Sequence, residues 1–310
     1  PKLRMKVQLT GWSPFTPGDP DSSSLPVVGL EYKFTSQYDR PVEAVFSFNS
    51  KNFMECGEGR RAVRGIPGGF VLMQEGTDSA PHHSGAFCVS VSDTDVKIDL
   101  GWFRGNWSDP LTMAWKHISE GACFDRPELT DGDPSPGASL FVPLRFQPGQ
   151  SHTIKVRLAW YCGYTDIRQG RDPADMPPEL AVEGGHRPWY AGRFSDITEV
   201  ANYWRDHYAS LHDRTAAFTE CFYDTTLPPE VIEAVASNLT ILKSPTVLRQ
   251  IDGRLWGWEG SYDEAGCCHG TCTHVWHYAQ SICHLFPSLE QTLRETEFEV
   301  SQDDRGHQNF

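Results

Sequence analysis

The sequence lacks both a long hydrophobic run and an excess of basic residues. No stretch reaches the roughly 20 apolar residues that a transmembrane helix requires, so we expect no transmembrane segment in this chain. Lysine and arginine total 27 against 41 acidic residues, which gives a formal charge of −14. This balance repels a phosphate backbone and argues against a nucleic-acid partner. The acidic residues are interspersed, which is typical of a solubilising surface.

Motifs of several enzyme classes are missing as well. There is no G-x-S-x-G elbow for a serine nucleophile and no glycine-rich phosphate-binding loop. The 9 cysteines do not form a small-domain disulfide framework, which slightly favours the cytoplasm. The sequence begins at Pro1 without an initiator methionine or a signal peptide and stops at Phe310 without a helix stop. We therefore interpret it as a fragment cut at both ends, and secretion stays open.

The first half of the chain alternates apolar and polar residues with a period of two. Met5, Val7 and Leu9 alternate with polar neighbours, which predicts a strand with one buried and one solvated face. Turn residues separate further runs of this kind, as at 148–150. The predicted strands cover 3–10, 28–34, 42–48, 70–74, 86–92, 96–103, 139–146 and 152–161. Because no helical pattern lies between them, we expect an antiparallel β-sandwich over 1–162.

The second half changes to helical spacing. Residues 163–222 are predicted to form an irregular connection and then a linker helix, in which apolar residues recur every three or four positions from Ile197 to Leu211. A second helix is predicted after Pro228 and Pro229, because proline suits the first helical turn. Its predicted buried stripe is Val231, Val235, Leu239 and Leu242. A third helix is expected from about 271–273, with a restart at Pro287.

A tight-turn signal at Asp252-Gly253 predicts a hairpin that carries Glu259. Trp256 and Trp258 precede this glutamate. An indole face can cover the C–H face of a sugar ring while a carboxylate attacks or stabilises the anomeric carbon. By strand alternation the two indoles share one face and Glu259 points to the other, so at least one indole is expected in the core. These residues favour a glycosidase, with an exposed carboxylate at the end of a hairpin as the alternative.

Several separated blocks occur in a characteristic order along the chain: GWSPFTPGDPDSSSLPV (11–27), NLTILKSPTVLR (238–249), DGRLWGWEG (252–260), GTCTHVWHYAQ (270–280) and LFPSLEQTLRE (285–295). Together they resemble glycoside hydrolase family 116, which includes the non-lysosomal glucosylceramidases and bacterial β-glucosidases. The resemblance implies a β-sandwich leading into an (α/α)6 barrel whose first helices occupy 223–310. It also implies retaining hydrolysis of a β-glucoside, glucosylceramide or a related glycan.

The resemblance further implies roles for individual residues. Glu259 matches the family's nucleophile, and Trp258, Thr273 and His274 are expected to bind substrate, although relatives have an aspartate at the position of Thr273. The acid/base aspartate belongs to a later T-Y-D-type motif, which does not occur before Phe310. The chain would then carry half of the catalytic pair, and we expect it to be inactive alone. No organic cofactor and no metal are expected.

Two other functions stay open. A thiolate-metal protein is one, because cysteines and histidines suit zinc, although structural zinc sites draw ligand pairs from more distant segments. The residues concerned are Cys267, Cys268, His269, Cys272, His274 and His277. A non-catalytic carbohydrate-binding protein, in which the sandwich binds glycan, is the other. Stoichiometric zinc would favour the first function, and glycan binding without turnover would favour the second.

Overall fold

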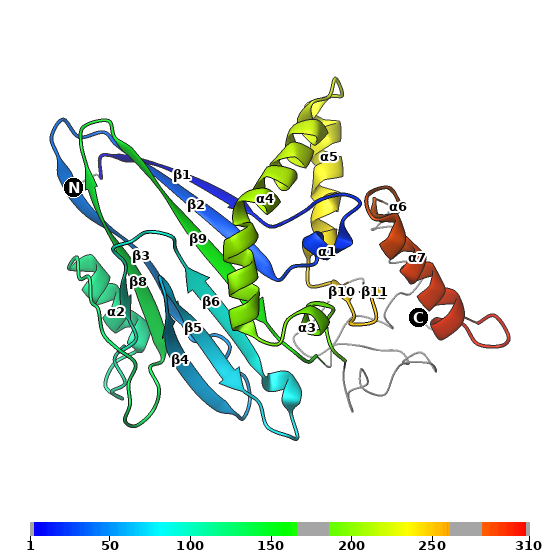
Figure 1. Cartoon of the computed structure of the whole chain (residues 1–310), viewed down its shortest axis with the longest axis horizontal. Coiled ribbons are helices and arrows are strands. Elements are labelled where there is room, and N and C mark those ends of the chain that lie inside the picture. The colour runs from blue at the N-terminus through cyan, green and yellow to red at the C-terminus, as the bar shows by residue number, and fades with distance from the viewer. Residues whose placement is uncertain (1–2, 166–185, 259, 261–280, 308–310) are drawn as a thin grey trace. The chain divides into compact units, whose positions relative to one another are not determined.

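Figure 1 shows the protein as a computed structural model, which describes residues 3–165, 186–258, 260 and 281–307. The chain divides into two compact units. The sandwich unit comprises Pro1–Ser13, Pro26–Tyr161 and Ile197–Asp206. The helical unit comprises Pro14–Leu25, Cys162–Asp196 and His207–Phe310.

The sandwich unit is built from two antiparallel sheets (Figure 1). The larger sheet has six strands in the order β1 (Met5–Trp12), β2 (Val27–Ser36), β9 (Ser151–Tyr161), β6 (Gly85–Ser90), β5 (Gly69–Glu75) and β4 (Arg60–Ile66). The smaller sheet has three strands in the order β3 (Val42–Lys51), β8 (Gly137–Phe146) and β7 (Lys97–Asp99). A 3₁₀ turn and a helix lie between strands, η1 (Pro81–His83) and α2 (Pro110–Ser119).

Apolar residues from both sheets form one core. Leu72 of β5, Ile154 of β9 and Leu140 of β8 are fully buried and belong to the same cluster. Each buried aliphatic side chain of this size contributes about 1.5–3 kcal/mol, so this cluster holds the two sheets face to face. The predicted order of an antiparallel β-rich part followed by helices is confirmed.

Strand β1 departs from the prediction of one buried face. Its Val7 and Leu9 side chains are 47% and 56% exposed. The strand lies at the edge of the larger sheet, where its ladder partner is β2, and none of its residues belongs to the core cluster. Alternation along a strand therefore predicted its conformation correctly but not its burial, which depends on what faces it.

The expectation that no helix interrupts the strands is wrong at α2. Asp109 caps this helix, and its carboxylate accepts a hydrogen bond from the Thr112 N–H at 2.8 Å. Pro110 occupies the first turn, where its missing N–H costs nothing. The Asp-Pro pair is a helix-start signal, and the prediction from two-residue alternation did not take it into account. The strand predicted at 96–103 is correspondingly shorter, and the arginine-rich β4 was not predicted.

The helical unit consists of helices, most of them short, and one β-hairpin. Its elements are α1 (Pro20–Ser23), α3 (Tyr190–Arg193), part of α4 (Ile197–Tyr223), α5 (Pro229–Leu239), η2 (Thr240–Lys243), β10 (Val247–Arg249), β11 (Leu255–Gly257), α6 (Ile282–Leu285), α7 (Pro287–Glu295) and a π-helical turn, η4 (Thr296–Ser301). Helix α4 is the predicted linker helix. Its first ten residues belong to the sandwich unit, where the ring of Trp204 packs 5.0 Å from that of Trp12.

Helix α5 begins at Pro229 as predicted, but the expected burial of the stripe is observed only in part: Leu239 and Leu242 are partly buried, and Leu242 packs against the cluster of Leu289 and Leu293. Val231 and Val235 are 43% and 44% exposed, because no described residue covers this face of the helix. Helix α7 restarts at Pro287 as predicted and buries Leu289 and Leu293. None of the described helices combines the length and the apolar composition that a bilayer span requires.

Candidate functional site

The hairpin of β10 and β11 forms as the Asp-Gly signal predicted. Gly253 adopts a left-handed conformation with φ +92°, and its N–H donates to the Gln250 carbonyl oxygen at 2.9 Å to close the turn. Leu248 then faces Trp256 across the ladder, and Arg249 faces Leu255. This register sets which side chains of the two strands lie on the same face of the hairpin.

The two tryptophans of β11 lie in the core of the helical unit. Trp256 is 0% exposed and Trp258 is 2% exposed, and their ring centroids are 6.4 Å apart with an interplanar angle of 25°. Leu248 packs against the pair. The prediction that at least one indole belongs to the core is confirmed. The indole N–H of Trp258 is buried and donates to no described group.

Gln250 is a buried polar residue that the sequence did not single out. It is 1% exposed, and neither its side-chain oxygen nor its side-chain nitrogen has a hydrogen-bond partner among the described residues. Its backbone N–H donates to the Arg254 carbonyl oxygen at 2.8 Å. A buried amide that none of these residues satisfies costs free energy, so this side chain does not stabilise the hairpin through them.

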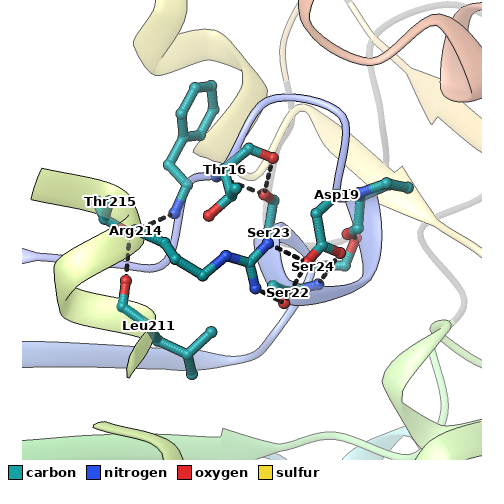
Figure 2. A network of polar contacts seen from close by, with 10 residues as sticks. Thr16, Asp19, Ser22, Ser23, Ser24, Leu211, Arg214 and Thr215 are labelled. Carbon is teal, nitrogen blue, oxygen red and sulfur yellow. Dashed lines mark hydrogen bonds and ion pairs between the residues drawn. The ribbon is translucent and has the colours of Figure 1, made fainter. Parts of the chain in front are cut away.

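Residues 14–25, here called the clasp loop, form a polar network with helix α4 (Figure 2). Arg214 donates to the Asp19 carboxylate at 2.5 Å, and Thr215 accepts a hydrogen bond from the Phe15 N–H at 3.1 Å. Asp19 also caps α1 by accepting from the Ser22 N–H at 3.0 Å. Burial alone would raise the pKa of Asp19, but the hydrogen bonds from Ser22 and Arg214 and the charge of Arg214 lower it to about 2.

The clasp loop is also held by apolar and backbone contacts. The Phe15 ring packs 5.5 Å from that of Phe218 and 5.3 Å from that of Phe286. The Gly18 N–H donates to the carbonyl oxygen of Leu285 at 2.7 Å. The loop is therefore anchored to α4, to α6 and to the start of α7 within the helical unit.

Two basic side chains near the hairpin, Lys243 and Arg249, also contact the clasp loop. Lys243 is exposed as a whole residue, and its ammonium group donates to the Ser23 carbonyl oxygen at 2.7 Å. Desolvation of the ammonium group by the protein around it lowers the pKa of Lys243 to about 8. Arg249 donates to the Asp21 carboxylate at 2.7 Å. A shallow cavity of about 680 Å³ lies beside Asp21 and is also lined by Trp189, Gly192, Arg193 and Ile251.

Most of the residues predicted to act on substrate lie outside the described residues. Glu259, Thr273 and His274 belong to this group, as do the other cysteines and histidines of the predicted metal alternative, Cys267, Cys268, His269, Cys272 and His277. Trp258 is the one predicted substrate-binding residue whose position is described, and it is buried. Over the described ranges there is no group of three histidine, cysteine, aspartate or glutamate residues that could hold a metal ion.

Comparison with known proteins identifies a sequence family that matches this chain. The sequence model described as beta-glucosidase 2, glycosyl-hydrolase family 116 N-term, matches residues 1–211. No curated protein matches the chain. Among solved structures, a protein described as a kojibiose phosphorylase from the human microbiome matches at 10% identity with a TM-score of 0.36. That match covers 71% of this chain and 21% of the other protein, and a superposition this loose supports no functional conclusion.

Proposed function

Because the chain belongs to glycosyl-hydrolase family 116, we propose that it is part of a retaining β-glycoside hydrolase of the β-glucosidase or glucosylceramidase type. The observation that carries this proposal is the family match over residues 1–211. The hairpin that leads to Glu259 supports it, because a carboxylate following two tryptophans suits attack on a sugar. The substrate would be a β-glucoside, glucosylceramide or a related glycan.

In the proposed mechanism Glu259 attacks the anomeric carbon on the face opposite the leaving group. The bond from this carbon to the aglycone oxygen breaks, an ester bond to the glutamate forms, and an aspartate acid gives its proton to the departing oxygen. The same aspartate then takes a proton from the water that hydrolyses the ester. Retention places the two carboxyl groups about 5–5.5 Å apart. We assign no residue among these 310 to the aspartate, and no organic cofactor takes part.

The remaining predicted features belong to the same proposal. Thr273 and His274 would contact the sugar, while the burial of Trp258 favours a supporting role behind the substrate. The helices after residue 223 would begin an (α/α)6 barrel, preceded by a sandwich domain over 1–162 and a connection over 163–222.

Covalent labelling tests the proposal directly. A 2-deoxy-2-fluoro-β-glucoside with an activated leaving group should esterify Glu259 in the full-length gene product, and mass mapping locates the label. Glu259→Gln keeps the shape but removes the nucleophilic charge, so kcat should fall by several orders of magnitude while binding largely survives. Glu264→Gln is the matched control and should retain its activity. A label on another carboxylate, or near-normal activity of Glu259→Gln, would contradict the assignment.

Glycan binding by the sandwich unit is a second candidate, favoured by two exposed tryptophans. Trp107 is 76% exposed and Trp115 on α2 is 69% exposed, which is unusual for residues of this size. Indole faces in such positions suit stacking on sugar rings. Replacing both with alanine should abolish the binding of an insoluble β-glucan, whereas Tyr223→Ala, which removes another exposed aromatic ring, should not. Unchanged binding by the double variant would exclude this surface.

A further inference from the structure

We propose that Asp21 of the clasp loop and Arg249 of β10 form a positioning pair, which holds the hairpin in place for the covalent step at Glu259. This inference rests on the proposed function, because it concerns the geometry of the same nucleophile. Neither residue touches the reacting atoms in this proposal. Their role is to fix β10, the strand that pairs with β11, after which Glu259 follows in the sequence.

Arg249 is held on three sides. Its Nη1 donates to Asp21 Oδ1 at 2.7 Å and to the Ser24 hydroxyl at 3.4 Å. Its guanidinium carbon lies 4.4 Å from the centre of the Trp189 ring, and its backbone oxygen accepts from the Trp189 N–H at 2.8 Å. The Arg249 side chain is only 14% exposed. Both the main chain and the side chain of this residue are therefore fixed.

The neighbouring residue fixes the opposite face of the same strand. Side chains alternate between the two faces of a strand, and Leu248 packs against Trp256 and Trp258 in the core. Strand β10 is thus held by the tryptophan pair on one face and by Asp21 on the other. Its ladder with β11 ends at Gly257, two positions before Glu259 in the sequence.

The clasp loop is rigid enough to act as the fixed partner. Asp19 caps α1 next to Asp21 and pairs with Arg214, and Lys243 holds the Ser23 carbonyl oxygen on the other side (Figure 2 shows the network around Asp19). A carboxylate on a loop with independent anchors at both ends can set the position of a strand rather than follow it.

The pair is suited to orientation rather than to stability. The Asp21 side chain is 54% exposed, and an ion pair with a partner this exposed adds little to the free energy of unfolding. Catalysis is far more sensitive, because a misplacement of about 1 Å can cost about 100-fold in rate. Loss of the Asp21 charge should therefore affect the covalent step much more than the fold.

The test is the burst of dinitrophenolate that the full-length gene product releases from dinitrophenyl 2-deoxy-2-fluoro-β-glucoside. This leaving group departs without a proton, so the burst rate reports the attack by the nucleophile and not the acid step. Asp21→Asn should lower the saturating rate constant about tenfold or more, with less than about a threefold change in the half-saturating concentration. Asp21→Glu, which restores the carboxylate, should recover most of the rate.

A matched control comes from the sandwich unit. Arg61 pairs with Glu55 at 2.6 Å, and the Glu55 side chain is 41% exposed, so Glu55→Gln removes a similar ion pair and should keep the wild-type rate. If the wild-type protein is labelled at Glu259 but Asp21→Asn reacts at the wild-type rate, or if Glu55→Gln is equally slow, the positioning role is wrong and the proposed function stands. A wild-type protein without a label at Glu259 overturns both.

Discussion

Removal of the Asp19 charge should weaken the helical unit in a way that depends on pH. Asp19→Asn keeps an oxygen that can cap α1 but loses the charge that faces Arg214 at 2.5 Å. The pKa of Asp19 falls from 3.8 to about 2, which sets an upper limit of about 2.4 kcal/mol on the stabilisation. Because the side chain is 29% exposed, solvent screening reduces this value, and we expect about 1 kcal/mol at pH 7.

The pH dependence follows from the sign of the shift. A carboxylate whose pKa is lowered in the folded state stabilises the protein fully above its unfolded pKa of 3.8, and the contribution disappears as the pH falls to about 2. The free-energy difference between wild type and Asp19→Asn should therefore shrink between pH 5 and pH 2.

Urea denaturation of the full-length gene product, followed by near-UV circular dichroism, measures both effects. A double-mutant cycle with Arg214→Gln isolates the pairwise term. The exposed carboxylate of Asp78 provides the control, since Asp78→Asn should leave stability and its pH dependence unchanged. A coupling energy of zero at pH 7, or a difference that persists at pH 2, would refute the assignment of the shift to this pair.

Three further outcomes are expected. Cys88 is 1% exposed, and burial raises its pKa to about 12. In the native protein, iodoacetamide at pH 8 should therefore modify the exposed Cys56 and Cys221 but not Cys88. Peptide mapping that finds Cys88 modified at a similar rate would contradict this. Because no described residue bonds the Gln250 side-chain amide, Gln250→Met should leave the free energy of unfolding in urea unchanged or raise it by up to about 1 kcal/mol; a large loss would mean that the amide has a partner. Activity of the full-length gene product should survive chelation, and loss with rescue by zinc alone would support the thiolate-metal alternative.

Local sequence patterns predicted the elements better than their environments. The apolar patterns of β2, β3, β5, β6, β8 and β9 and the spacing of α4 reflect backbone conformation, although β5 and β8 are buried along consecutive residues rather than on one face. The same alternation misled for β1, where Val7 and Leu9 lie on an edge strand, and helical spacing misled for Val231 and Val235. Whether a side chain is buried depends on the elements that pack against it, and periodicity in the sequence does not show whether such an element is present.

The polar contacts around the candidate site could not be predicted in the same way. The Asp21 and Arg249 pair joins positions 228 residues apart, and the Asp19 and Arg214 pair joins positions 195 apart. Among 41 acidic and 27 basic residues, composition selects no pairing. Only the fold brings the clasp loop to the hairpin, so the sequence identified Glu259 and the tryptophans as candidates but not the residues that orient their strand.

The place of the clasp loop also constrains how the two units can be separated. Residues 14–25 follow the first strand of the sandwich in the sequence but belong to the helical unit in contacts. A chain that starts at residue 163 would lose Phe15 from its aromatic cluster, Asp19 from Arg214 and Asp21 from Arg249. The helical unit is therefore physically incomplete without the N-terminal segment, and the family match that begins at residue 1 includes part of its framework.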